Sequence, residues 1–294
     1  MQRLAPNSPL AQDGLLWSQQ EWSPLRAHNP ATPATPASPS TAIDRLITRL
    51  PLLLALYLLG IALAETVTTY FHPQLGLVLH GALLALIILH ASLASPPDQQ
   101  KFLITLALAP LIRLLSLSMP LVQFQFTYWY GIIGAPLFIS AFLVGRLTGI
   151  GPRQIGLALG KWPLQVLVGL SGVALGWIEY RILKPAPLVE SWSLEQVLLP
   201  ALILLVFTGF LEEYIFRGLM QRAAGAVMAR FGLIYVSLLF AVLHIGYRSL
   251  ADFAFVFCVG LGFSLVAQRT RSIWGVTLAH GLTNITLFLI YPFF

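Results

Sequence analysis

Charged side chains are scarce in this sequence. Its 294 residues include only 17 Lys and Arg and 11 Asp and Glu, which makes 10% charged residues. Soluble domains carry roughly 25%. Apolar residues make up 57% of the chain, and the mean hydropathy is +0.80. A soluble globular protein needs a polar surface that this composition does not supply. The composition therefore excludes that class and predicts a membrane protein.

Cysteine is almost absent, because Cys258 is the only one and lies in an apolar block. An intramolecular disulfide and a cysteine-based metal cluster are therefore excluded. The sequence also has no Lys- and Arg-rich patch with interleaved aromatic residues. Its net charge of +6 comes from basic residues at the ends of apolar blocks, where they act as topology signals. We therefore expect no nucleic-acid partner.

The first 42 residues have little apolar sequence and hold seven of the twenty prolines. They end in the run PATPATPASPS. Such a segment buries too little apolar area to offset the entropy lost on ordering. We predict a disordered Pro-rich tail over residues 1–42, with a partner-binding polyproline stretch as the alternative. No apolar region precedes Pro51, so a secretory signal is not expected.

The remaining chain consists of apolar blocks close to the length that crosses a bilayer. About 20 helical residues, rising near 1.5 Å each, cover a hydrocarbon core of ~30 Å. The blocks are continuously apolar, whereas the strands of a membrane β-barrel alternate. We predict an all-α polytopic helical bundle with eight to nine spans. The nine candidates are residues 50–69, 75–94, 102–119, 128–147, 162–182, 194–216, 231–245, 251–267 and 273–293.

Basic residues are distributed unevenly between the two ends of these spans. If the N-terminus is cytoplasmic and the nine spans alternate, thirteen Lys and Arg fall on the cytoplasmic side and three on the other. Cytoplasmic loops of membrane proteins carry such an excess. We therefore expect an integral, multi-pass membrane protein with a cytoplasmic N-terminus.

Ionisable residues within the spans are costly, so each is a candidate for function. Glu65 and Glu179 lie within several residues of a span end, and we expect a structural or interfacial role for both. His80 and His90 have no acid near them in the sequence, which favours neutral, hydrogen-bonded rings. Arg113 is expected to pair with a carboxylate on another span.

The sequence LEEYIFRG, at the end of the sixth block, places two carboxylates beside an arginine. Residues four apart share a helix face, whereas adjacent residues diverge by about 100°. Glu213 can therefore form an ion pair with Arg217, and Glu212 points elsewhere. A carboxylate without that partner, in a poorly hydrated site, is suited to act as a general base.

The next motifs place further polar groups on two later blocks. FAVLH sets Phe240 and His244 on one face, and HGLTN does the same for His280 and Asn284. Glu212 and His244 could share a water molecule, while His280 and Asn284 could donate hydrogen bonds to one oxyanion. Each motif alone could be a packing contact between helices. Three motifs in order, on three membrane helices, favour a catalytic site.

The patterns E-E-x-x-x-R, F-x-x-x-H and H-x-x-x-N together resemble the CAAX protease and bacteriocin-processing family of intramembrane endopeptidases. This family is also called abortive-infection proteins and includes the type II prenyl-protein endopeptidase. The resemblance covers residues 194–294, which it marks as a catalytic core, and residues 43–193 look like a membrane scaffold of about five spans. It implies peptide-bond hydrolysis within the bundle, at a site that we expect to open toward the cytoplasm. It also implies the roles of the site residues: Glu212 as base, His244 as its partner, His280 and Asn284 as oxyanion donors, and Glu213, Arg217 and Phe240 as support.

Other interpretations stay open. Glu212, His244 and His280 have the composition of a catalytic zinc site, but the sequence has no H-E-x-x-H, which favours a metal-free site without a cofactor. The same groups could serve as a proton relay in a transporter, although we find no repeated halves. A non-catalytic scaffold with the family fold is the third alternative. For the peptidase we expect a peptide or protein substrate, possibly anchored in the membrane, and contacts with membrane lipid.

Overall fold

The computed structural model describes residues 50–119 and 124–294. Every regular element in these ranges is helical, and none is a strand. The expected all-α membrane bundle is therefore confirmed. The predicted disordered tail, residues 1–42, lies outside the described residues.

The elements, in chain order and with their bounds, are α2 (Leu50–Tyr70), α3 (Pro73–Leu93), α4 (Pro97–Leu106), α5 (Leu108–Ser118), α6 (Phe126–Thr148), α7 (Pro152–Ile155), α8 (Trp162–Leu183), α9 (Leu194–Ile203), α10 (Leu211–Glu213), α11 (Gln221–Met228), α12 (Phe231–Val242), α13 (Leu250–Thr270) and α14 (Trp274–Ile285).

Short π-helical and 3₁₀ segments complete the chain. The π-helical segments η1 (Leu204–Phe210) and η2 (Tyr214–Met220) join α9, α10 and α11 into one helical run, and η4 (Thr286–Ile290) continues α14. The 3₁₀ turns are η3 (Ile245–Tyr247) and η5 (Tyr291–Phe293). A π-helical turn widens the hydrogen-bond ring and often occurs at functional sites.

Eight helical runs in the described ranges are long and apolar enough to cross a membrane. The longest, Leu194–Met228, has 35 residues and extends well beyond the expected 194–216. The seventh expected span, 231–245, corresponds to a shorter apolar helix, Phe231–Tyr247, whose α-helical part, α12, has only 12 residues. At 1.5 Å per residue it spans about 18 Å, short of a ~30 Å hydrocarbon core. The structure therefore supports a multi-pass protein with eight full-length spans in this part of the chain.

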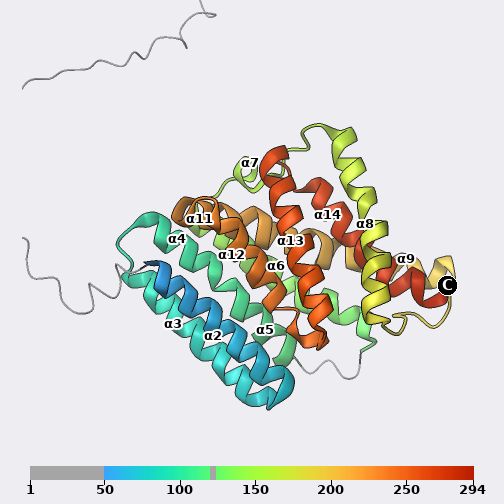
Figure 1. Cartoon of the computed structure of the whole chain (residues 1–294), viewed down its shortest axis with the longest axis horizontal. Helices are drawn as coiled ribbons and strands as arrows, with labels where there is room; N and C mark the ends of the chain where they lie inside the picture. The colour runs from blue at the N-terminus through green and yellow to red at the C-terminus, as the bar shows by residue number, and fades with distance from the viewer. Residues whose placement is uncertain (1–49, 120–123) are drawn as a thin grey trace, which may run out of the picture. The chain divides into compact units, whose positions relative to one another are not determined.

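Close helix contacts bring α14 against both α8 and η1 (Figure 1). A Cβ on Gly172 of α8 would lie 2.1 Å from the Ala279 carbonyl oxygen, so only glycine permits this approach. On η1, a Cβ on Gly209 would lie 3.0 Å from the Gly281 Cα. Small residues bring membrane helices together in this way. The two contacts flank His280, so they place the third sequence motif beside the first.

The α12–α13 hairpin lies between α2 and the α8–α14 pair, as Figure 1 shows. On one side, the Tyr235 hydroxyl of α12 donates to the Leu54 carbonyl of α2 over 3.1 Å. On the other side, α13 packs against both α8 and α14. The second motif, at the end of α12, therefore sits between the N-terminal helices and the helices that carry the other two motifs.

Candidate active site

The two neighbouring glutamates lie in α10, a short α-helical segment between the π-helical segments η1 and η2. Their environments differ, as the sequence predicts. The Glu213 side chain is fully buried, whereas that of Glu212 is 28% exposed. Only Glu212 can therefore meet a water molecule or a substrate directly.

Glu213 and Arg217 form the predicted ion pair. Nη1 of Arg217 donates to Oε1 of Glu213 over 2.9 Å, and both side chains are almost completely buried. The guanidinium also donates to the Gly260 carbonyl of α13 over 3.2 Å. Its central carbon lies 4.6 Å from the centre of the Phe240 ring, which adds a cation–π contact. Arg217 thus links η2 to α12 and α13.

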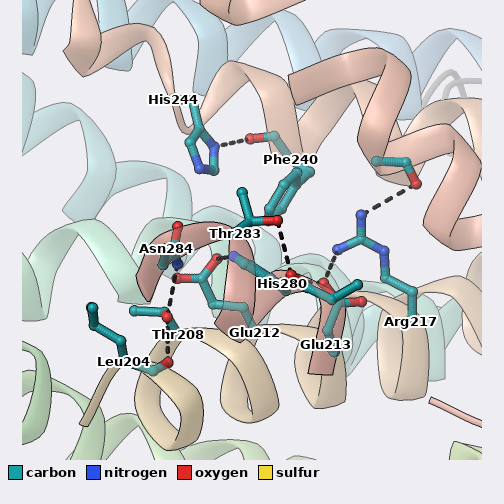
Figure 2. A network of polar contacts seen from close by, with 12 residues as sticks. Leu204, Thr208, Glu212, Glu213, Arg217, Phe240, His244, His280, Thr283 and Asn284 are labelled. Atoms are coloured by element: carbon teal, nitrogen blue, oxygen red, sulfur yellow. Dashed lines mark hydrogen bonds and ion pairs between the residues drawn. The ribbon is translucent and has the colours of Figure 1, made fainter. Parts of the chain in front are cut away.

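His280 lies between the two carboxylates, and Figure 2 shows the Glu212 carboxylate pointing toward the ring. Its Nδ1 is 2.9 Å from Oε1 of Glu213, and its Nε2 is 3.9 Å from Oε2 of Glu212. Because a carboxylate accepts hydrogen bonds, Nδ1 donates to Glu213. A second proton on Nε2 would make that nitrogen a donor as well. Glu213 therefore orients the imidazole, a role that the sequence motifs do not reveal.

The Asn284 side chain is hydrogen-bonded to the π-helical segment η1. Its Nδ2 donates to the Thr208 hydroxyl over 2.8 Å, and that hydroxyl donates to the Leu204 carbonyl over 2.5 Å. Thr208 lies four residues before Glu212, so Asn284 is attached to the helical run that carries the acid. An amide nitrogen has a second N–H, which this bond does not use.

His244 approaches the site from the end of α12. Its Nδ1 lies 2.7 Å from the Phe240 carbonyl oxygen, which can only accept. Nδ1 therefore carries a proton, and in the neutral ring Nε2 has a lone pair. The Phe240 ring packs against both imidazoles, with centroid distances of 4.6 Å to His244 and 5.9 Å to His280. Phe240 thus spaces the two histidines apart.

Two cavities meet at His244. A cavity of about 380 Å³, within the usual range for ligand pockets, is lined by Glu212, His244 and Arg113 with mostly apolar neighbours. A smaller one of about 40 Å³ is lined by His244, His280, Asn284 and Glu179. All four predicted catalytic residues therefore border this pair of adjacent cavities.

Several residues behave differently from the sequence-based expectation. Glu65 and Glu179, expected near watery span ends, are only 1% and 7% exposed. Glu65 pairs with Arg113, which confirms that the arginine has a carboxylate partner on another span. His80 is buried 3.5 Å from Glu65, and His90 is hydrogen-bonded to a tyrosine and a glutamine. The position of Glu65 and Glu179 near a span end did not predict their burial. Packing between helices excludes water from these side chains, independently of their depth in the membrane.

The alternative zinc site would use Glu212, His244 and His280. In the part of the chain that the structure describes, no three His, Cys, Asp or Glu side chains converge as metal ligands. The Nδ1 of each imidazole is bonded to an oxygen, the Phe240 carbonyl for His244 and the Glu213 carboxylate for His280. Glu212, His244 and His280 are thus not among such groups in the described residues.

Comparison with protein families gives a match in the last third of the chain. Residues 194–286 match the family model described as type II CAAX prenyl endopeptidase Rce1-like. No curated protein and no solved structure matches the chain. The matched segment contains all three motifs, including the four predicted catalytic residues, and ends just beyond Asn284.

This segment of the chain is similar to the CAAX protease family, in agreement with its motifs. The coarse function that follows is that of an intramembrane CAAX-type endopeptidase, a protease that acts on a peptide or protein in a membrane environment. The helices before residue 194 lie outside the match.

Proposed function

We propose that the chain hydrolyses a peptide bond with a water molecule activated by Glu212. In this mechanism, the water oxygen attacks the carbonyl carbon of the scissile bond and Glu212 takes the proton. Nε2 of His244 accepts a hydrogen bond from the other O–H of the water, which stays on the oxygen, and so orients the nucleophile. When the tetrahedral intermediate collapses, the proton held by Glu212 passes to the departing amine. General-base catalysis of this kind contributes about 10²–10⁴-fold.

The observation that carries the proposal is the contrast between the two adjacent glutamates. Glu213 is fully buried and occupied by Arg217 and His280, whereas Glu212 is partly exposed in a cavity that it shares with His244. The first carboxylate is suited to hold the site together. The second is the one that can reach a reacting water.

The oxyanion of the intermediate is assigned to His280 and Asn284. Since Nδ1 of His280 already donates to Glu213, donation to an oxyanion requires a second proton on Nε2. Asn284 has an N–H beyond the one given to Thr208. A protonated His280 and Arg217 together would balance the two negative charges of Glu212 and Glu213. Two preorganised donors in a poorly hydrated site stabilise developing charge strongly.

We propose residues 194–294 as the catalytic core and residues 43–193 as the scaffold around it. The N-terminus and the mouth of the site are assigned to the cytoplasmic side, on the strength of the basic-residue distribution. The proposed mechanism uses no metal or other cofactor.

The test is a cleavage assay with the full chain reconstituted in liposomes. The probes are a quenched fluorescent peptide with a farnesylated C-terminal CAAX sequence and the same peptide without the lipid. Glu212→Ala should reduce cleavage at least 100-fold while the protein stays folded and inserted. Glu195→Ala, which removes an exposed carboxylate from α9 of the same helical run, is the matched control and should retain wild-type activity.

Cleavage at the wild-type rate by Glu212→Ala would refute the mechanism. If Glu212→Ala is inactive, a comparison of the membrane peptides that accumulate in cells expressing wild type or this variant identifies the natural substrate. Proton-coupled flux in the same liposomes, lost in Glu212→Gln without any cleavage by wild type, would favour the transporter.

A further inference from the structure

A charged cluster links three N-terminal helices that lie outside the family match. Glu65 of α2 forms an ion pair with the Nε of Arg113 on α5, and Nε2 of His80 on α3 lies 3.5 Å from the same carboxylate. Glu65 and His80 are fully buried, and Arg113 is 21% exposed. A buried ion pair is tolerated only when further hydrogen bonds satisfy its remaining groups. The further hydrogen bond that the Arg113 guanidinium donates indicates the role of this residue.

Arg113 reaches the end of α12. Its Nη2 donates to the carbonyl of Leu243, the C-cap residue of this helix, which directly precedes His244. The last carbonyls of a helix have no partner within the helix, and a cation at that end is favourable. The carbonyl of Phe240, one turn earlier, receives Nδ1 of His244. Two terminal carbonyls of α12 are thus bonded by Arg113 and by the histidine of the site.

A second attachment lies on the other side of His244. Arg248 donates through Nη2 to the Thr69 carbonyl of α2 over 2.5 Å. The intervening turn, η3, packs against α2. Since a short turn between two fixed points has little freedom, the backbone at His244 is held from both directions by α2 and its partner helix α5.

We propose that Arg113, held by Glu65, is a positioning residue for His244. This proposal rests on the proposed function, in which His244 orients the nucleophilic water. Because Leu243 directly precedes His244, a shift of its carbonyl would move the imidazole relative to the Glu212 carboxylate. Arg113, Glu212 and His244 line the same cavity. The N-terminal helices α2 and α5 then help to position a residue of the active site. Misplacement of a catalytic group by about 1 Å can reduce a rate by 10²-fold.

The variant that tests this role removes both charges, because Arg113→Gln alone would leave Glu65 buried without a cation. The double variant Glu65→Gln/Arg113→Gln, in the full chain in liposomes, should lower kcat for the cleaved peptide by about 10–100-fold. KM should stay within about twofold of wild type. Arg113→Lys keeps a cation and a donor, and should recover part of kcat. Arg181→Gln removes an exposed arginine from the end of α8 and should change neither parameter.

Hydrogen exchange measured by mass spectrometry supplies a readout that does not depend on activity. In the double variant, exchange should be faster over residues 240–248 and unchanged in α8 and α14. Wild-type kcat in the double variant, or unchanged exchange in that segment, would overturn the proposal. A raised KM with wild-type kcat would also overturn it, since Arg113 would then act on the substrate. If wild type cleaves no peptide, the proposed function fails, while the exchange measurement still tests the anchoring.

Discussion

Loss of the Arg217 guanidinium should destabilise the protein more than any change to an exposed arginine. Arg217→Gln removes the ion pair with Glu213, the hydrogen bond to the Gly260 carbonyl and the contact with the Phe240 ring. It leaves Glu213 fully buried, with His280 as its remaining partner. An uncompensated buried charge, and not the missing bonds alone, is the main source of the expected loss.

The magnitude follows from the burial of the pair, since the two side chains are 1% and 0% exposed. Removing one partner of a buried ion pair costs about 3–5 kcal/mol in soluble proteins. In a membrane the unfolded helices also find polar partners, which places the effect at the lower end. We expect the free energy of unfolding to fall by about 3 kcal/mol. The double variant Glu213→Gln/Arg217→Gln should recover part of this loss, because it removes the unpaired charge.

The assay is equilibrium unfolding in bicelles, with Arg181→Gln as the matched control. The control should stay within about 0.5 kcal/mol of wild type, as surface substitutions do. A loss below 0.5 kcal/mol for Arg217→Gln would refute the reasoning. A double variant less stable than Arg217→Gln would refute the assignment of the loss to unpaired charge.

Two further predictions concern the chemistry and the packing of the site. The mechanism needs an ionised Glu212 and a protonated His280, so kcat/KM should fall at low pH, where Glu212 is protonated, and at high pH, where His280 loses its proton. In His280→Gln the side chain is a neutral donor at every pH, so the fall at high pH should disappear. A fall at high pH that stays unchanged in this variant would contradict the oxyanion role. Gly172→Ala should lower the free energy of unfolding by about 1–3 kcal/mol, because its Cβ would lie 2.1 Å from the Ala279 carbonyl oxygen. Gly262→Ala, where a Cβ has no neighbour within 4 Å, is the control and should be neutral or slightly stabilising; equal effects of the two changes would contradict the packing argument.

Features with a local cause could be predicted from the amino-acid sequence. The scarcity of charge and the length of the apolar blocks predict a helical membrane bundle, which the structure confirms. The ion pair between Glu213 and Arg217 follows from their four-residue spacing on one helix, and it is present. The different exposure of Glu212 follows from the same geometry, since adjacent residues face different directions.

Features that depend on contacts between helices could not be predicted in this way. Glu213 bonds His280, 67 residues later, and Arg113 bonds the Leu243 carbonyl, 130 residues later. Glu179 lines the smaller cavity although its place near a span end suggests contact with water. Helical periodicity tells which residues share a face, but it does not tell which other helix that face meets. That choice depends on close approaches such as the one at Gly172, and these arise only when the whole bundle packs.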